Sequence, residues 1–270
     1  MSGPFITFLS DYGLDDDFVG ICHGVIATIC PEARVIDIAH GVRRHDVRAG
    51  AVILRDALAY MPAGVHLAVV DPDVGAERRA VTLRLDDDRL LVGPDNGLLW
   101  PAAQSGGGVV EAADIARSRF RLEPLSATFH GRDIFAPVAA RLAAGSSLAE
   151  AGDPCDPDEL VRLELPRARV QAGVLVAHAL HVDKYGNVSL DADHGDIAGM
   201  GLKLGRSVEL DLGDHGAHQA SYARTFADVQ AGELLVYEDA HRRLAVAINH
   251  GNAAAALGIA LDDELRIKAA

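Results

Sequence analysis

The sequence of 270 residues is poor in aromatic side chains, in cysteine and in positive charge. Aromatic residues make up 5% of the chain, so aliphatic residues and alanine supply most of its 49% apolar content. That balance favours alternating strands and helices over an aromatic-rich binding surface. The chain has 25 lysines and arginines against 39 acidic residues, for a net charge of -14. Such a surface could not neutralise a row of phosphates, so we expect no nucleic-acid partner.

Cysteine and long apolar runs are equally scarce. Cys22, Cys30 and Cys155 form no C-x-x-C pair, and an odd, sparse set of this kind is typical of reduced thiols in a cytosolic protein. The N-terminal segment has no basic region, and no stretch reaches the roughly 18 apolar residues of a membrane span. The sequence therefore predicts a cytoplasmic protein that does not associate with a membrane.

Hydrophobic periodicity in the first half predicts strands that alternate with helices. This order implies right-handed βαβ crossovers and a mainly parallel sheet. A hairpin and a further helix that ends at Gly145 are expected after the alternating part. The predicted strands are 5–9, 35–38 and 65–70, the helices 18–30, 45–61 and 132–144, and the hairpin strands 81–85 and 90–92.

A segment rich in proline, glycine and aspartate at 152–157 predicts a domain boundary. Beyond it, short apolar runs at near-regular spacing are typical of a small barrel or sandwich. We therefore expect an α/β domain over 1–152, a linker over about 153–167 and a β domain over 168–270. The predicted strands of the second domain are 170–182, 188–190, 207–212, 234–237 and 244–248.

Two carboxylates follow predicted strands at the edge where parallel sheets bind ligands. Asp11 follows the first strand and Asp71 the third, although aspartate also ends strands and caps turns without any further role. His40, His45 and His130 adjoin strand ends or glycine turns and can converge with them. No H-x-x-x-H, H-x-H or cysteine–histidine pair gives the spacing of metal ligands, so we predict no metal. The pattern alone leaves an α/β enzyme or a ligand-binding protein with an acidic pocket.

Six short motifs follow one another over roughly 240 residues. They are S-D-Y-G at 10–13, V-V-D-P-D-V-G with E-R-R at 69–79, G-P-D-N-G at 93–97, T-F-H-G-R-D-I-F at 128–135, D-K-Y-G-N at 183–187 and N-H-G-N-A at 249–253. Together they resemble the motifs of the SAM (S-adenosyl-L-methionine) hydroxide adenosyltransferases, or SAM hydrolases, which are related to fluorinase and chlorinase. Six motifs in order make this resemblance far more specific than one short motif would be.

The resemblance implies an N-terminal α/β domain, a C-terminal β-barrel domain and a homotrimer with its sites at subunit interfaces. It also implies hydrolysis of SAM to adenosine and L-methionine, with no cofactor. Carried over by motif, Asp71, Arg78 and His130 form the catalytic set that positions and activates the water.

The same resemblance implies substrate-binding residues in both halves of the chain. Asp11 is expected to hold the ribose hydroxyls, while Asn187 and Asn249 read the adenine. Asp16 and Asp183 are expected to face the amino group of the methionine part. The full set is Asp11, Asp16, His45, Phe129, Asp183, Tyr185, Asn187, Asn249 and His250.

The chemistry of such a reaction needs little beyond an oriented water. Attack at the ribose C5′ expels a neutral thioether from a sulfonium, so no general acid is required. Arg78 stays protonated and can stabilise hydroxide, whereas Asp71 or His130 accepts the proton. The related halogenases place an aromatic hydroxyl at the position of Asp71 and a tyrosine at that of His130. Because a carboxylate repels a halide in a dry site, water is the favoured nucleophile.

One residue departs from the family pattern, and two other functions remain open. Asp73 stands where the D-P-G-V-G turn usually has glycine; a positive φ there would strain it, and its charge would lie near the water. A non-catalytic sensor of SAM or adenosine is one alternative. A metal-dependent hydrolase is the other, with Asp11, His40, His45, Asp71 and His130 as its ligands.

Overall fold

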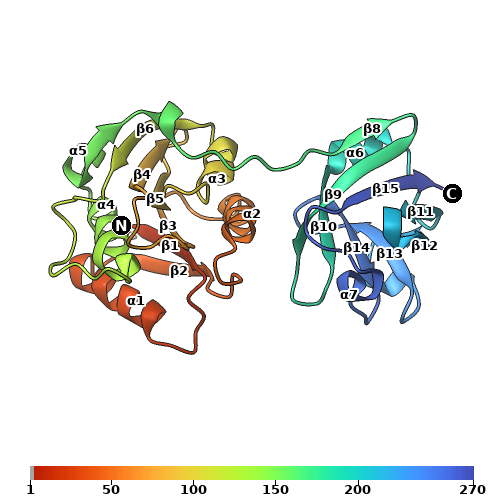
Figure 1. Cartoon of the computed structure of the whole chain (residues 1–270), viewed down its shortest axis with the longest axis horizontal. Helices are drawn as coiled ribbons and strands as arrows, with labels where there is room; N and C mark the ends of the chain where they lie inside the picture. Colours follow the sequence, from red (N-terminus) through yellow and green to blue (C-terminus); the bar gives the residue numbers. More distant parts are fainter. Residues whose placement is uncertain (1–2) are drawn as a thin grey trace. The chain divides into compact units, whose positions relative to one another are not determined.

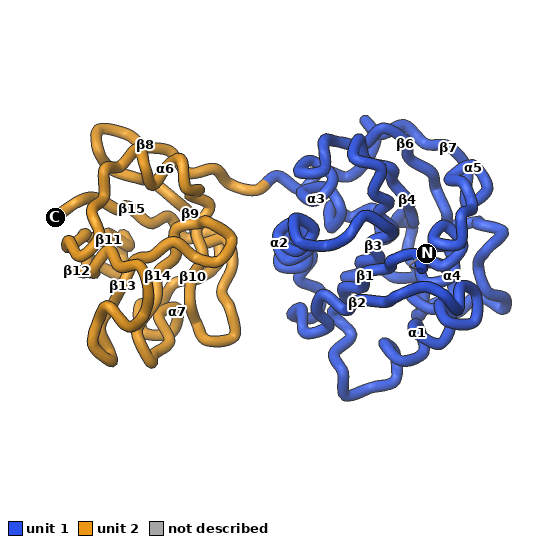
Figure 2. Tube along the Cα trace, turned by 180° about the vertical axis from the view of Figure 1, so that it is seen from behind, with its two compact units in different colours: residues 1–164 blue, residues 165–270 orange. Residues whose placement is uncertain are grey.

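The computed structural model describes residues 3–270, and the chain forms two compact units (Figure 1). The first ends at Glu164 and the second spans Leu165–Ala270 (Figure 2). This division falls inside the linker predicted at 153–167. Within the described residues, no helix has both the length and the apolar character needed to cross a membrane.

Unit 1 is built on a seven-stranded sheet with the order β2-β1-β3-β5-β4-β6-β7. The strands β2, β1, β3 and β5 are parallel, whereas β4, β6 and β7 join antiparallel. The predicted α/β fold and the predicted hairpin are confirmed, and the antiparallel edge makes the sheet mixed. The strands are β1 (Phe5–Ser10), β2 (Arg34–Ala39), β3 (Val65–Val69), β4 (Ala80–Leu85), β5 (Leu90–Pro94), β6 (Val109–Asp114) and β7 (Asp153–Cys155).

Helices cover both faces of this sheet. In β1, Ile6 and Phe8 pack into one core and Leu9 into the other, as expected of a parallel strand buried on both sides. The helices of the first core are α1 (Phe18–Ile29), α4 (Ala136–Ala143) and α5 (Leu148–Ala151), and those of the second are α2 (Val47–Leu58) and α3 (Trp100–Ser105).

The helix predicted at 132–144 is not a regular α-helix. Residues Gly131–Phe135 form a π-helical turn, and α4 begins only at Ala136. Pro137 has no N–H with which to bond the carbonyl of Asp133, and the backbone N–H of Leu122 donates to that carbonyl instead, at 2.7 Å. The helix therefore starts with a widened turn, a feature often found at functional sites.

Unit 2 is a closed barrel of seven strands, because β9 and β10 pair and join the two ends of the ladder. Strand β8 pairs only with β9 and lies outside the closed ring. The β-barrel implied by the resemblance is thereby confirmed. The strands are β8 (Arg169–Gln171), β9 (Val174–Val182), β10 (Val188–Asp193), β11 (Ser207–Asp211), β12 (Ala217–Tyr222), β13 (Leu234–Glu238), β14 (Arg243–Ile248) and β15 (Glu264–Ala269), with helices α6 (His194–Gly199) and α7 (Ala253–Leu257).

Three barrel elements differ from the prediction. The run predicted as one strand over 170–182 is split, because Ala172 and Gly173 both have positive φ, at 50° and 79°. Strand β12 was missed because Ala220 is its only buried residue. Strand β15 was also missed, although Leu265 and Ile267 alternate with exposed neighbours as a half-buried strand requires.

Candidate active site

Three side chains meet beyond the end of β3. Asp71 follows that strand, Arg78 precedes β4, and His130 directly precedes the π-helical turn. Arg78 Nε donates to Asp71 Oδ1 at 2.8 Å, while its Nη2 donates to Asp71 Oδ2 and, at 3.0 Å, to His130 Nδ1. The side chains of Arg78 and Asp71 are 8% and 5% exposed. The structure thus brings the three expected catalytic residues into one hydrogen-bonded set.

Arg78 fixes the tautomer of His130. A guanidinium only donates hydrogen bonds, so His130 Nδ1 must accept, and the ring proton lies on Nε2. Burial and the charge of Arg78 lower the pKa of His130, which keeps the imidazole neutral. Arg78 also lies 5.2 Å from the centroid of the Phe135 ring. The set therefore combines a carboxylate, a fixed positive charge and a neutral N–H donor.

The G-P-D-N-G turn forms hydrogen bonds to the residues adjacent to Asp71 and Arg78. Asn96 Nδ2 donates to the carbonyl of Val70, the residue before Asp71, at 2.9 Å. Asp95 accepts from Arg79 Nε, next to Arg78, also at 2.9 Å. One turn therefore holds the backbone beside Asp71 and the side chain beside Arg78. The motif was recognised in the sequence, but no role for its residues was predicted from it.

The strain considered for Asp73 does not arise. Asp73 is not among the described residues with positive φ. In this turn the positive φ, 83°, falls on Gly75, where a Cβ would collide with the carbonyl oxygen of Ala127. Gly75 is therefore the position that needs glycine, both for its backbone conformation and for space.

Asp11 lies beside the Asp71–Arg78–His130 set because Ser10 in β1 pairs with Val69 in β3. Its Oδ2 accepts a hydrogen bond from the backbone N–H of His45 at 2.9 Å. His45 has a φ of 66°, so this bond holds a turn in an uncommon conformation. The structure thus brings Asp11 and His45 together, whereas Asp16 is exposed in the loop before α1.

Phe129 belongs to an aromatic cluster at the same edge. Its ring lies edge-to-face with those of Tyr12 and Phe18, at centroid distances of 5.9 and 5.0 Å. Phe129 is 8% exposed, whereas Phe18 is 39% exposed. Of the two, Phe18 therefore offers more apolar surface to a ligand, although only Phe129 was expected to bind one.

Tyr12 is a site residue that was not singled out from the sequence. Its hydroxyl occupies the place that a side chain at Gly131 would fill. Burial, and then the nearby Cys22, Asp11 and Asp71, raise the pKa of Tyr12 well above its usual value. Tyr12 is therefore a neutral phenol near two carboxylates. Its occurrence in the S-D-Y-G motif was the available signal.

The substrate-binding residues expected in the second half line one cavity of unit 2. Its volume is about 1050 Å³, large enough for a nucleoside and more. The expected residues in its wall are Asp183, Tyr185, Asn187, Asn249 and His250.

Hydrogen bonds within the cavity wall orient two amides. Asp183 Oδ2 accepts from Asn187 Nδ2 at 2.8 Å, and Asp183 Oδ1 accepts from the backbone N–H groups of Tyr185 and Asn187. Asn249 Nδ2 donates to the carbonyl of Val229 at 2.9 Å. Each amide thus has its nitrogen engaged by the protein. The carboxylate of Asp183, expected to face an ammonium group, is largely used in its own turn.

The cavity also contains residues that were missed from the sequence. The rings of Phe226 and Tyr237 lie 5.0 Å apart, and Phe226 is 37% exposed. Burial raises the pKa of Tyr237 to about 12, so its phenol is neutral. In a chain with few aromatic residues, the pair was a signal that could have been read. The missed lining residues include Thr225, Phe226, Tyr237, Asp239 and His241.

Both units match known proteins. Residues 6–152 match the SAM hydroxide adenosyltransferase N-terminal domain, and residues 177–266 match the SAM hydroxide adenosyltransferase C-terminal domain. The chain belongs to the SAM hydroxide adenosyltransferase family. All six motifs that carry the resemblance fall within these two matched ranges, four in the first and two in the second.

Individual relatives of this family are similar over nearly the whole chain. An (R)-S-adenosyl-L-methionine hydrolase of Salinispora tropica is 49% identical over 266 residues, which is 98% of each chain. A fluorinase of an Actinoplanes species is 28% identical over 91% of each chain. The crystal structure of an uncharacterised conserved protein from Thermotoga maritima superposes with a TM-score of 0.91 at 35% identity, covering 97% of this chain and 99% of that one.

The five candidate metal ligands of the alternative hydrolase do not form one cluster among the described residues. Among residues 3–270, the group of side chains placed to share a metal ion consists of His23, Asp37 and His40. Of the five residues considered, only His40 belongs to this group. Asp71 and His130 instead share Arg78, whose positive charge would oppose a cation bound between them.

Proposed function

We propose that the chain hydrolyses S-adenosyl-L-methionine to adenosine and L-methionine, and that Asp71, Arg78 and His130 are its catalytic residues. The observation that carries the proposal is the Asp71–Arg78–His130 contact in a chain 49% identical to an (R)-S-adenosyl-L-methionine hydrolase. A carboxylate held against a guanidinium beside a neutral imidazole suits the activation of water and repels halide.

The hydrogen bonds support a proposed role for each member of the set. His130 Nδ1 is occupied by Arg78 and Nε2 carries the ring proton, so this imidazole donates to the water and orients it. Asp71 retains free lone pairs and accepts the proton. The water oxygen forms a bond to C5′ as the C5′–S bond breaks, and the electron pair of that bond returns to sulfur. Arg78 stabilises the developing hydroxide without giving up a proton.

Recognition of the nucleoside is proposed for Asp11 in unit 1 and for the cavity of unit 2. Asn187 and Asn249 keep their carbonyl oxygens for the amino group of adenine, because their nitrogens bond to the protein. The aromatic pair Phe226 and Tyr237 offers a ring face for stacking. Asp16 remains the candidate for the methionine amino group, since the carboxylate of Asp183 serves its own turn.

A product assay separates this proposal from the two alternatives. The protein is incubated with SAM in the presence and absence of EDTA, and with chloride varied, while adenosine and methionine are quantified. Equal amounts of both products that are unaffected by EDTA and chloride support hydrolysis. Retention of SAM without products would indicate a sensor instead, and loss of activity in EDTA would indicate a metal-dependent hydrolase.

The chain is further proposed to act as a homotrimer with its sites at subunit interfaces. The groups that handle water belong to unit 1 and the amides that read adenine to unit 2, so a neighbouring subunit can supply the second set. Co-expression of Asp71→Asn with Asn249→Ala subunits tests this arrangement. Activity is measured at SAM concentrations far below KM, where sites carrying Asn249→Ala contribute at most about a tenth of the wild-type rate. A shared site then restores about one quarter of the wild-type activity, since mixed trimers each regain one intact site of three. A site formed within one subunit leaves only the low activity of the Asn249→Ala sites.

The proposed location is the cytoplasm. All three cysteines are free thiols, and Cys22 and Cys30 are buried, so the fold needs no oxidising compartment. Cell fractionation of the source organism with an antibody to the protein checks this location.

A further inference from the structure

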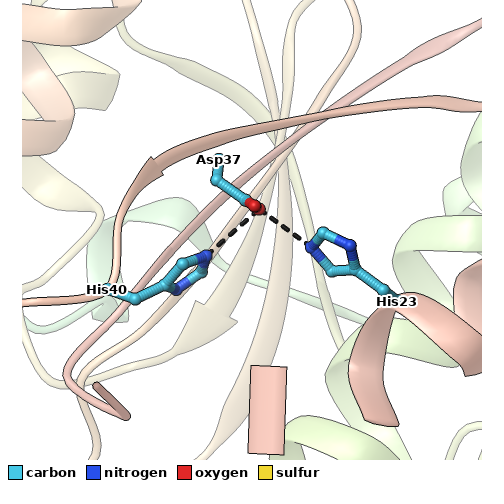
Figure 3. Close-up of side chains that lie close together, drawn as sticks. All are labelled: His23, Asp37 and His40. Atoms are coloured by element: carbon cyan, nitrogen blue, oxygen red, sulfur yellow. Dashed lines mark hydrogen bonds and ion pairs between the residues drawn. The ribbon is translucent and has the colours of Figure 1, made fainter. Parts of the chain in front are cut away.

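A second cluster of polar side chains lies in unit 1, outside the proposed catalytic set. His23 projects from α1, Asp37 lies in β2, and His40 follows the end of that strand (Figure 3). The Nε2 atoms of both histidines face the same oxygen, Asp37 Oδ1, at 2.9 Å from His23 and 3.1 Å from His40. The three ligand atoms lie within 4.8 Å of one another. Two elements of the fold therefore present two imidazoles and a carboxylate to one point.

The most buried residue of this cluster, His40, has one ring nitrogen without a well-aligned hydrogen bond. The side chain of His40 is 3% exposed, and its Nε2 makes no hydrogen bond of acceptable geometry although Asp37 Oδ1 is close. Its other nitrogen, Nδ1, lies 2.7 Å from Ser10 Oγ. A buried ring nitrogen without an aligned partner is costly unless something else occupies its lone pair.

Both imidazoles are held in place by their surroundings. The fully buried ring of Phe8 lies 4.7 Å from the ring of His40 and 6.1 Å from that of His23, centroid to centroid. The contact of His40 Nδ1 with Ser10 Oγ is the kind of support that fixes metal-bound histidines, where the free ring N–H donates to an acceptor. The ring orientations are thus set before any ligand arrives.

We propose that His23 Nε2, Asp37 Oδ1 and His40 Nε2 bind one divalent transition-metal ion, for which Zn²⁺ is the best match. Two imidazoles and one carboxylate are the three protein ligands of a known class of zinc site, with water in the fourth position. Tetrahedral zinc places its ligand atoms about 3.3 Å apart, so the two histidine–carboxylate separations need to open by only a few tenths of an ångström. The Nε2 atoms of His23 and His40 lie within 4.8 Å of each other, within reach of one ion. The half-exposed Asp37 and His23 leave the fourth position open to water.

The bound ion would stabilise the segment 10–13, which contains Asp11. His40 already holds this segment twice, through Ser10 Oγ and through its backbone carbonyl, which accepts from Gly13 N at 2.7 Å. A metal on His40 ties that segment to α1 through His23. It lies outside the Asp71–Arg78–His130 set and takes no part in the proposed hydrolysis, which continues in EDTA.

Calorimetric titration of the tag-free, EDTA-treated chain with Zn²⁺ tests the proposal. Wild-type protein is expected to bind one ion per chain, and Zn²⁺ at 100-fold above the dissociation constant raises the thermal midpoint by about 5–10 °C. His23→Ala and Asp37→Asn are each expected to weaken binding by at least about 100-fold. His194→Ala is the matched control, because it removes an exposed histidine paired with a single carboxylate, Glu238, in unit 2.

One site per chain that is lost in both variants and kept in His194→Ala supports the proposal. Absence of binding to the wild type, or equal binding by wild type and His23→Ala, overturns it. Far-ultraviolet circular dichroism in EDTA confirms that the variants are folded, and the visible absorption of wild-type protein with Co²⁺ gives a second measure of the site. His23 is 36% exposed, so its replacement leaves the core intact.

Discussion

The proposed catalytic residues of unit 1 are largely buried and bonded to each other, whereas the proposed binding residues of unit 2 include exposed side chains. In unit 1, Asp71 and Arg78 are 5% and 8% exposed and bond to each other, so their geometry is fixed in advance. In unit 2, Tyr185 is 63% and Phe226 37% exposed, and the cavity amides keep open acceptors. A group that activates water must be oriented before reaction, whereas a recognition surface must remain free to receive its ligand. We therefore expect changes in unit 1 to affect turnover and changes in unit 2 to affect binding.

Asp71→Asn is expected to have the largest effect. The amide cannot accept the proton from water, so kcat should fall by about 10²- to 10⁴-fold. The affinity for SAM, measured by calorimetry, should change little, because the role proposed for the side chain is to contact the water and not the nucleoside. Asp73→Asn is the matched control, since Asp73 is an exposed aspartate two residues away. A kcat for Asp71→Asn equal to that of the control would remove Asp71 from the mechanism.

The contrast between the units also explains how much could be predicted from the sequence. Asp71 was found because it ends a buried apolar run, and the edge of a parallel sheet is a known place for ligands. Arg78 and His130 lie 52 residues apart in irregular segments, where periodicity carries no information, and only the motifs indicated them. The π-helical turn beside His130 depends on Pro137 and a bond from Leu122, which no local pattern encodes.

In unit 2 the missing information was of another kind. Strand β12 buries only Ala220, so alternation did not mark it, although the turn with Gly213 and Gly216 that joins it to β11 in a hairpin was an available signal. Without that strand, Phe226 and Tyr237 could not be placed in one cavity. The motifs still found Asn187 and Asn249, because a turn with a fixed side-chain bond leaves a short local signature.

Asn249→Ala tests whether a change in unit 2 affects substrate binding and not turnover. Loss of a hydrogen bond to adenine should raise KM for SAM by about 10- to 100-fold, corresponding to roughly 1–3 kcal/mol, while kcat at saturation stays near the wild-type value. Gln230→Ala removes an exposed amide that does not line the cavity and should leave both constants unchanged. A fall in kcat with constant KM would instead assign Asn249 to the chemical step.

A pH dependence of stability is expected in unit 1. Burial, and then the charge of Arg89, lower the pKa of His66 from 6.5 to about 4. The unfolded histidine takes up a proton near pH 6.5 while the folded one does not, so lowering the pH favours the unfolded chain. The cost at pH 5 is about 2 kcal/mol.

Urea unfolding at pH 7.5 and pH 5 measures this cost. The single tryptophan, Trp100, lies in α3, so its fluorescence reports on unit 1 alone. The His66→Asn variant keeps a polar group near Thr7 Oγ1, which lies 2.9 Å from His66 Nδ1, and cannot titrate. Its stability should depend less on pH than that of the wild type. An unchanged pH dependence in this variant would show that other groups are responsible.

Asn96→Asp is expected to have the smallest effect. It tests whether the Asp71–Arg78–His130 set depends on the hydrogen bonds of the G-P-D-N-G turn. The aspartate retains an acceptor for the backbone N–H of Leu98 but loses the N–H that donates to the carbonyl of Val70. The Val70 carbonyl adjoins Asp71, so the carboxylate loses one constraint on its position. One hydrogen bond of about 1 kcal/mol corresponds to a kcat about fivefold lower, with KM unchanged. Asn96→Ala removes both bonds and should lower kcat further. Equal kcat values for both variants and the wild type would mean that the Asp71–Arg78–His130 contacts suffice to hold the geometry without the turn behind them.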